Sequence, residues 1–263
     1  MMVSGTARSL PCSVRSDGPV TLAFVLVAAA VCPHTPLIVP DLAGLGRAEL
    51  HEVRSACHTA VAALRAAAPD LLVVVGGSDT TRRYGTHAAG SLRAWGVDVR
   101  TGPGEPVLPP SLTIGRWLLE NGARDLETVA FQAVASAADP KDCLALGAEL
   151  VGEGRVALLV MADGSACLTP KAPGPYDPAA GPYHDLIVRA VSGVDATALA
   201  GLDPDEADRF SVGGRAALQV LAGARTGGAL GGRLLARAEP YGVGYLVGIW
   251  EGLRAAGGGP GSS

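Results

Sequence analysis

Three apolar runs in this chain each end abruptly in polar residues, and this pattern constrains the fold more than any other feature. The runs are Val25–Val31, Leu71–Val75 and Val156–Met161. Short, uninterrupted apolar runs are typical of strands buried on both faces of a parallel sheet. The carboxyl ends of such strands meet at one edge of an open α/β sheet, where ligands bind. We therefore expect the polar residues after the three runs to share one cleft.

Segments with helical spacing separate the apolar runs. Residues 47–67 place apolar side chains at three- and four-residue steps, and residues 111–121 form a helix that a glycine ends. Asp139-Pro140 and Asp203-Pro204 each combine a capping carboxylate with a proline in the first turn. Strands that alternate with helices predict an α/β fold, a single domain with a central, mostly parallel sheet flanked by helices on both faces.

The remaining elements are shorter. We expect strands over 127–134, 233–238 and 245–250, a short edge strand over 95–99, and a helix over 183–191. The helix that starts after Asp203 is weakened by Gly213-Gly214 before it reaches Leu221, because glycine is unfavourable inside a helix.

The ends of the chain differ from its middle. We expect a disordered extension over 1–19, the α/β domain over 20–252 and a flexible, glycine-rich tail over 253–263. The apolar segment Val20–Cys32 imitates a signal peptide. It is shorter than the ~20 apolar residues that span a bilayer and lacks a clean cleavage site, so we interpret it as a strand.

Composition narrows the classes of partner. The chain is 48% hydrophobic and 17% charged, which is typical of a globular protein. A net charge of −4 without a Lys or Arg block argues against nucleic acid and against a membrane surface, and leaves a small molecule as the expected partner. Five widely spaced cysteines without a CxxC pair indicate reduced thiols in the cytoplasm. The oligomeric state stays open between a monomer and a homo-oligomer.

His34 is the strongest candidate for chemistry. It follows the first apolar run, in a loop stiffened by Pro33 and Pro36, which suits either a metal ligand or an acid/base group. An ordinary loop histidine is the alternative. Ser78 and Asp79 follow the second run and either bind a substrate or a metal, or form a turn.

The third run supplies a second group of candidates. Asp163 and Ser165 either line the pocket or form a turn, and Cys167 is either a nucleophile or a buried thiol. Lys171, in a proline-rich loop, either holds an anionic group or lies on the surface. Tyr241, in the turn between the last two strands, completes the expected substrate pocket.

Common catalytic signatures are missing from the sequence. It contains no P-loop, no complete GxGxxG fingerprint, and no HExxH, GxSxG or paired-cysteine zinc motif.

Four motifs in order resemble a known family over about residues 20–252: VAAAVCPHTPLIVPDLAG, VVVGGSD, ADGSACLTPKAPGPYD and EPYGVGYLVGIW. They are similar to the LigB-like superfamily of class III extradiol ring-cleavage dioxygenases, in its actinobacterial branch. The resemblance implies a single α/β domain with its cleft at the strand ends. It also implies an oxidoreductase that cleaves catechol-type aromatic rings with O₂ and Fe(II).

The resemblance also implies specific positions for the functional residues. Active members hold Fe(II) with two histidines and one glutamate, and use a further histidine as acid/base. The first ligand falls on His34. The other three positions fall on the segments at Ser78-Asp79, Arg215 and Cys167, where no histidine or glutamate stands. Asp79 is a substitute ligand in one interpretation. A non-catalytic member that binds a small molecule or a partner protein is the alternative function.

Overall fold

A seven-stranded sheet forms the centre of the protein. The computed structural model describes residues 25–44, 48–122, 128–225 and 229–253. The strand order is β3-β6-β2-β7-β1-β9-β8. The strands are β1 (Val25–Cys32), β2 (Leu71–Ser78), β3 (Arg82–Tyr84), β6 (Val129–Ala135), β7 (Arg155–Met161), β8 (Leu230–Ala238) and β9 (Tyr245–Gly252).

The four inner strands β6, β2, β7 and β1 run parallel. At the edges, β3 pairs antiparallel with β6, β9 pairs antiparallel with β1, and β8 pairs antiparallel with β9. This confirms the expected α/β domain with a mostly parallel sheet. The three apolar runs become β1, β2 and β7, which are direct neighbours. Residues 20–24 of the predicted domain, and the predicted extension over 1–19, lie outside the described residues, as does 254–263 of the predicted tail.

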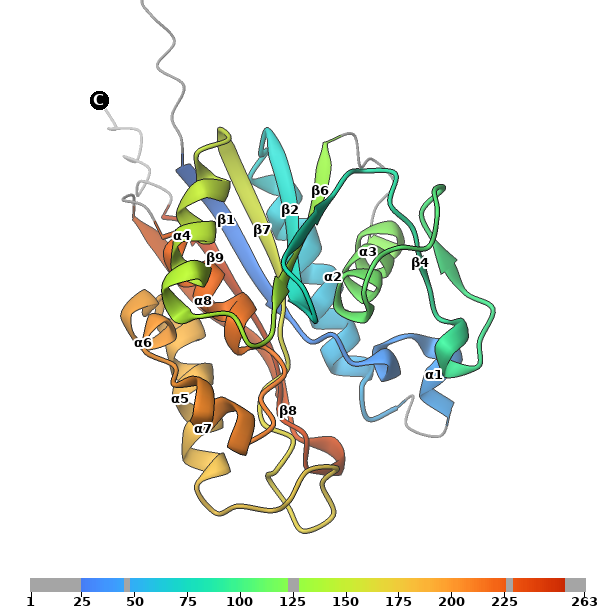
Figure 1. Ribbon diagram of the computed structural model, residues 1–263, viewed down its shortest axis with the longest axis vertical. Helices are drawn as coiled ribbons and strands as arrows, with labels where there is room; N and C mark the ends of the chain where they lie inside the picture. Colours follow the sequence, from blue (N-terminus) through green and yellow to red (C-terminus); the bar gives the residue numbers. More distant parts are fainter. Residues whose placement is uncertain (1–24, 45–47, 123–127, 226–228, 254–263) are drawn as a thin grey trace, which may run out of the picture.

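Helices cover both faces of the sheet, as expected (Figure 1). On one face lie α2 (His51–Ala66) and α3 (Pro110–Gly122). On the other lie α4 (Pro140–Val151), α5 (Ala180–Gly193), α6 (Ala196–Ala200) and α8 (Arg215–Gly223). The remaining helical segments are η1 (Pro36–Ile38), α1 (Pro40–Ala43), α7 (Pro204–Arg209) and η4 (Pro240–Gly242). Among the described residues, no helix has the length and apolar character needed to cross a membrane.

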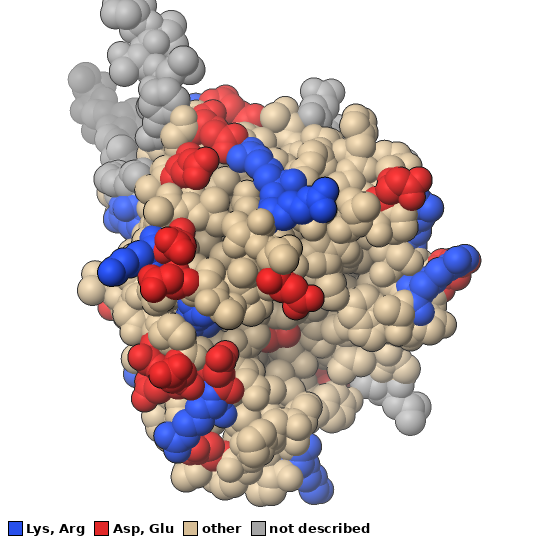
Figure 2. Space-filling model, in the orientation of Figure 1, with Lys and Arg blue, Asp and Glu red and all other residues tan. Residues whose placement is uncertain are grey.

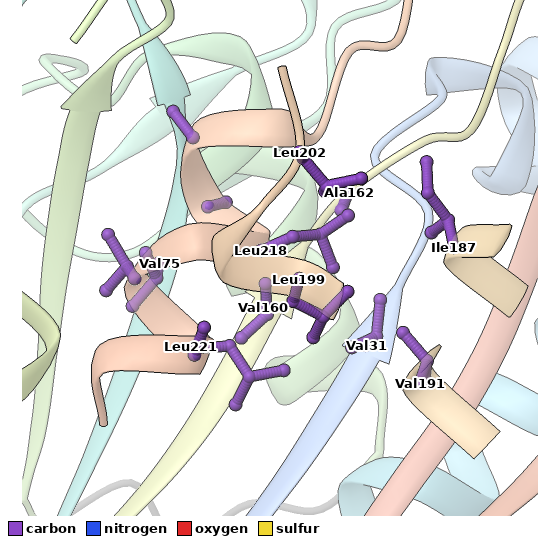
Figure 3. Close-up of a cluster of buried hydrophobic side chains, with 14 of the residues drawn as sticks. Val31, Val75, Val160, Ala162, Ile187, Val191, Leu199, Leu202, Leu218 and Leu221 are labelled. Carbon is purple, nitrogen blue, oxygen red and sulfur yellow. The ribbon is translucent and has the colours of Figure 1, made fainter. Parts of the chain in front are cut away.

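Two buried cores fix the sheet between the helices. In one of them, Val31, Val75 and Val160 of three neighbouring strands pack against Leu218 and Leu221 of α8 (Figure 3). All five side chains are almost fully buried, and each contributes about 1.5–3 kcal/mol relative to an exposed position. The ends of β1, β2 and β7 are therefore held rigidly beside one another.

The predicted helix starts are confirmed. The Asp139 side chain accepts a hydrogen bond from the Lys141 backbone N–H at the start of α4. The Asp203 side chain does the same for Glu206 in α7. Gly213-Gly214 separates α7 from α8, so the weakened helix is in fact two helices.

The expected edge strand over 95–99 is wrong. The chain forms a 3-10 turn, η3 (Arg93–Trp95), which ends at Gly96 with a left-handed φ of 85°. A small separate hairpin pairs β4 (Gly90–Ser91) with β5 (Arg100–Thr101). Gly96 turns the chain before the apolar residues can extend, which explains the misplaced strand.

The four described cysteines lie in the core with free thiols. Cys32, Cys57, Cys143 and Cys167 are buried and none forms a disulfide. Burial raises the pKa of the Cys57 thiol well above its usual value, with a smaller contribution from the neighbouring thiol of Cys32.

Candidate functional site

The carboxyl ends of β1, β2 and β7 meet at one edge of the sheet. Cys32 at the end of β1 is in register with Met161 at the end of β7, and Gly76 of β2 pairs with the same residue. The Ala162 N–H donates to the Cys32 carbonyl, which extends this alignment past the strands. The three strand ends are therefore adjacent, as predicted.

His34 and Asp163 come together at this edge. The His34 backbone N–H donates to Asp163 Oδ1 at 3.0 Å, and His34 Nδ1 lies 3.6 Å from Oδ2. The side chains are 22% and 16% exposed, so both are largely buried but reachable from solvent. The carboxylate thus holds the His34 backbone by a hydrogen bond, while its distance from Nδ1 is too long for a second one.

Burial changes the acidity of this carboxylate. Desolvation raises the pKa of Asp163 above its usual value, while His34 and the backbone N–H groups of His34 and Thr35 oppose the shift. An acid with a raised pKa beside an imidazole is typical of sites that move protons.

Tyr245 and Thr35 form the inner wall of the site. The Tyr245 hydroxyl and the Thr35 hydroxyl are 3.4 Å apart, and both residues are buried. Burial also raises the pKa of Tyr245, and Asp163 contributes through its negative charge. Tyr245 is therefore a neutral phenol that can donate a hydrogen bond at neutral pH.

Gly213 packs closely against the His34 ring. A Cβ at this position would lie 3.2 Å from His34 Cε1 and 3.4 Å from Nε2. The same segment, Val212 to Ala217, lines a small cavity of about 50 Å³ together with Gly77 and Ser136. Figure 2 shows this face of the molecule hollowed between the α5–α7 side and the α1 side, with acidic atoms inside the hollow.

The side chains of Ser78 and Asp79 take little part in the candidate site, although the two residues lie where β2 ends. Ser78 is half-buried and its carbonyl accepts hydrogen bonds from the backbone and the hydroxyl of Ser136, while Asp79 is exposed. Neither side chain has a contact with His34 or Asp163 in the described part of the chain.

Ser165 and Cys167 belong to a buried turn. The Ser165 hydroxyl donates to the Phe210 carbonyl at 2.7 Å and accepts from the Cys167 N–H at 3.0 Å. The Cys167 sulfur lies 3.6 Å from the Ser211 hydroxyl. The turn interpretation of Ser165 and the buried-thiol interpretation of Cys167 therefore account for their contacts.

Lys171 and Tyr241 lie at the surface. Lys171 is exposed. Tyr241 is 48% exposed, adopts a left-handed φ of 58°, and shares a side-chain hydrogen bond with Glu49 that raises the pKa of Tyr241. Both residues lie on segments that pack together, since the Leu168 N–H donates to the Gly242 carbonyl.

Tyr245, Thr35 and Gly213 were not singled out from the sequence. Tyr245 resembles an ordinary strand residue, and Gly213 resembles a helix breaker. The available signal was their position: Tyr245 begins a strand that pairs with β1, and Thr35 directly follows His34.

The described donors do not fit an Fe(II) facial triad. Such a site needs two imidazoles and one carboxylate around the metal. Across the four described ranges, no three His, Cys, Asp or Glu side chains come close enough to hold a metal together. At the position where the resemblance places the glutamate, Arg215 is buried and donates to the carbonyls of Ser136 and Ala138.

Two larger grooves lie away from these strand ends. One, of about 480 Å³, runs between α2 and β8, and another, of about 390 Å³, lies near the start of β1. Neither is lined by His34, Asp163, Tyr245 or Gly213. We place the functional site at the strand ends because the imidazole, the carboxylate and the phenol converge there.

No protein-family model and no curated protein matches this chain. Among solved structures, the uncharacterized protein JW3007 from Escherichia coli K12 is similar in fold, with a TM-score of 0.48 and 14% sequence identity. The match covers 86% of this chain and 100% of that one. This degree of similarity identifies neither a family nor an activity.

Proposed function

We propose that the protein binds a catechol-type aromatic molecule at the carboxyl edge of the sheet and exchanges a proton with it through His34. The observation that carries this proposal is the contact between His34 and Asp163, with Gly213 packed against the imidazole. A paired imidazole and carboxylate at a strand-end hollow is suited to general acid–base chemistry.

The geometry assigns a role to each group. Asp163 Oδ2 lies 3.6 Å from Nδ1, so a small closure of this gap would let Nδ1–H donate to the carboxylate and leave the lone pair on Nε2 free. Nε2 lies on the Gly213 side of the ring, and a ligand would reach it from the strand-end hollow beside this glycine. His34 would then accept the proton of a phenolic hydroxyl, and Asp163 would stabilise the imidazolium that forms.

The catechol class comes from the order of the four sequence motifs. These motifs also support an extradiol dioxygenase-like oxidoreductase that uses O₂ and Fe(II). Because the described donors do not fit the facial triad, we derive no step through iron. The proposed chemistry is limited to what His34, Asp163 and the neutral phenol of Tyr245 can do.

Binding without turnover is the second candidate function. It is favoured by Ser165 and Cys167, whose polar atoms are engaged in the turn at the end of β7. Bound catechol that is recovered unchanged after prolonged aerobic incubation would support this candidate over catalysis.

Isothermal titration calorimetry with catechol tests the proposal. We expect wild-type protein to bind catechol and to bind cyclohexane-1,2-diol, which lacks acidic hydroxyls, far more weakly. His34→Ala should weaken catechol binding at least about tenfold, because a charge-assisted hydrogen bond contributes roughly 1.5–3 kcal/mol. His87→Ala is the matched control, since His87 is exposed on a distant loop. Equal affinity of the His34→Ala variant and wild type would refute the proposal.

We also infer a cytoplasmic location from the free, buried thiols of the four described cysteines. Cell fractionation checks this inference, and recovery of the protein outside the cytoplasm would contradict it.

A further inference from the structure

His184 in α5 is a buried imidazole that the proposed chemistry does not use. The residue is fully buried, and neither Nδ1 nor Nε2 has a hydrogen-bond partner among the described residues. Burial lowers the pKa of His184, so the ring is neutral at neutral pH. An unpaired buried polar group costs about 1–3 kcal/mol, so simple core packing would favour an apolar residue here. The imidazole therefore calls for a specific explanation.

The ring is packed against two glycines on different segments. A Cβ at Gly164 would lie 2.2 Å from His184 Nδ1, and a Cβ at Gly244 would lie 2.5 Å from Cε1. The two segments are joined directly beside the ring. The Gly164 N–H donates to the Gly244 carbonyl, and the Gly244 N–H donates to the Ser165 carbonyl, both at 2.8 Å. Only glycine at both positions leaves room for the imidazole.

Each of these glycines adjoins a residue of the candidate site. Gly164 follows Asp163, whose carboxylate holds His34, and Gly244 precedes Tyr245, whose hydroxyl faces Thr35. The His184 ring therefore packs where the segments that carry Asp163 and Tyr245 lie side by side.

We propose that His184 is a positioning residue, whose flat ring sets the spacing between the Asp163–Gly164 and Gly244–Tyr245 segments and so places the carboxylate against His34. This inference rests on the proposed function only for the reason why the Asp163 carboxylate is needed beside His34. The placement itself can be tested without a ligand.

The test is an NMR spectrum of the ligand-free full chain with isotope-labelled histidine. The His34 ring signal reports the nearby Asp163 carboxylate, and the signals of the exposed His51 and His87 serve as internal references. We expect His184→Ala to move the His34 signal well beyond its linewidth, because the Asp163 carboxylate changes position when the His184 ring is removed. The reference signals should stay in place, and His184→Gln, which keeps a planar polar group, should move the His34 signal less.

Leu150→Ala is the matched control for destabilisation. Leu150 is buried in α4, which does not contact the two glycines, so its truncation should lower stability and leave the His34 signal unchanged. If His184→Ala does not fold, His184→Gln carries the test, and a displaced His34 signal is again the expected result. An unmoved His34 signal in a folded His184 variant, or an equal movement in Leu150→Ala, would overturn the inference. If wild type fails to bind catechol, the proposed function is refuted, but the NMR result for the His184 variants is unaffected.

Discussion

Asp163 is the residue at which stability and the proposed function conflict. Its carboxylate is largely buried, and the raised pKa means that the folded protein favours the protonated form. Stability from this group is fully present below its ordinary pKa of 3.8 and is lost as the pH rises through the higher value in the folded state. At neutral pH, the ionised carboxylate therefore costs stability.

Asp163→Asn should consequently stabilise the protein at pH 7 while weakening catechol binding. Asparagine can still accept the His34 backbone hydrogen bond but carries no charge to desolvate. We expect a gain of about 0.5–2 kcal/mol in the free energy of unfolding, the usual range for a stabilising substitution. Urea unfolding at pH 7 and pH 3.5 measures it, and the gain should shrink at the lower pH. A variant that is less stable than wild type at pH 7 would contradict the expectation.

At this scale the sequence predicted His34 and Asp163 because each directly follows an apolar run. Tyr245 and His184 could not be found in the same way. Their roles depend on pairing between β9 and β1 and on the packing of α5 against two glycines, which are contacts between distant parts of the chain. No local pattern records such contacts.

The segment between α7 and α8 is the element that borders the His34 ring. Gly213 lies against the imidazole with a separation that a single methyl group would fill. Neighbouring Ser211 has a left-handed φ of 49°, which bends the chain toward the strand ends. We interpret this segment as one wall of the ligand-binding hollow.

Gly213→Ala should weaken catechol binding by about an order of magnitude, because a displacement of even part of an ångström disturbs a fixed geometry. The fold should persist, since the nearest atom to the new Cβ is His34 Cε1 at 3.2 Å, a contact that a shift of a few tenths of an ångström relieves. Gly181→Ala in α5 is the control, because a Cβ there meets nothing within 4 Å. Calorimetry on both variants checks this, and an unchanged affinity in Gly213→Ala would place the ligand elsewhere.

Most elements were predictable because local signals agreed with the final packing. Uninterrupted apolar runs became the buried strands, and the capped proline starts at Asp139 and Asp203 became α4 and α7. The strand predicted over 95–99 was wrong because the prediction considered the apolar residues without the left-handed turn at Gly96. Gly213, Gly164 and Gly244 do more than interrupt elements, because each packs against a histidine ring at or beside the site.

At the scale of the whole molecule, the sheet order decides which chemistry is available. The order places β7 between β1 and β2, so the tips of the three strands form one edge. This edge collects one imidazole, one carboxylate and one phenol. The arrangement suits proton transfer better than tight binding of a transition metal.

The imidazole, carboxylate and phenol at the strand ends predict a low metal content for the purified protein. Anaerobically purified full-length protein should contain less than about 0.1 equivalent of iron, because high affinity needs three ligands together. Added Fe(II) should leave the thermal midpoint unchanged, since a ligand that does not bind the native state does not stabilise it. Elemental analysis and thermal unfolding measure the two effects. Stoichiometric iron that is lost in His34→Ala would show that the metal site exists.

A crystal structure of the protein soaked with catechol tests the central claim most directly. The account predicts electron density for the ring in the strand-end hollow, with one hydroxyl oxygen within hydrogen-bond distance of His34 Nε2. Catechol bound instead in the larger groove between α2 and β8, with the strand-end hollow empty, would contradict the account.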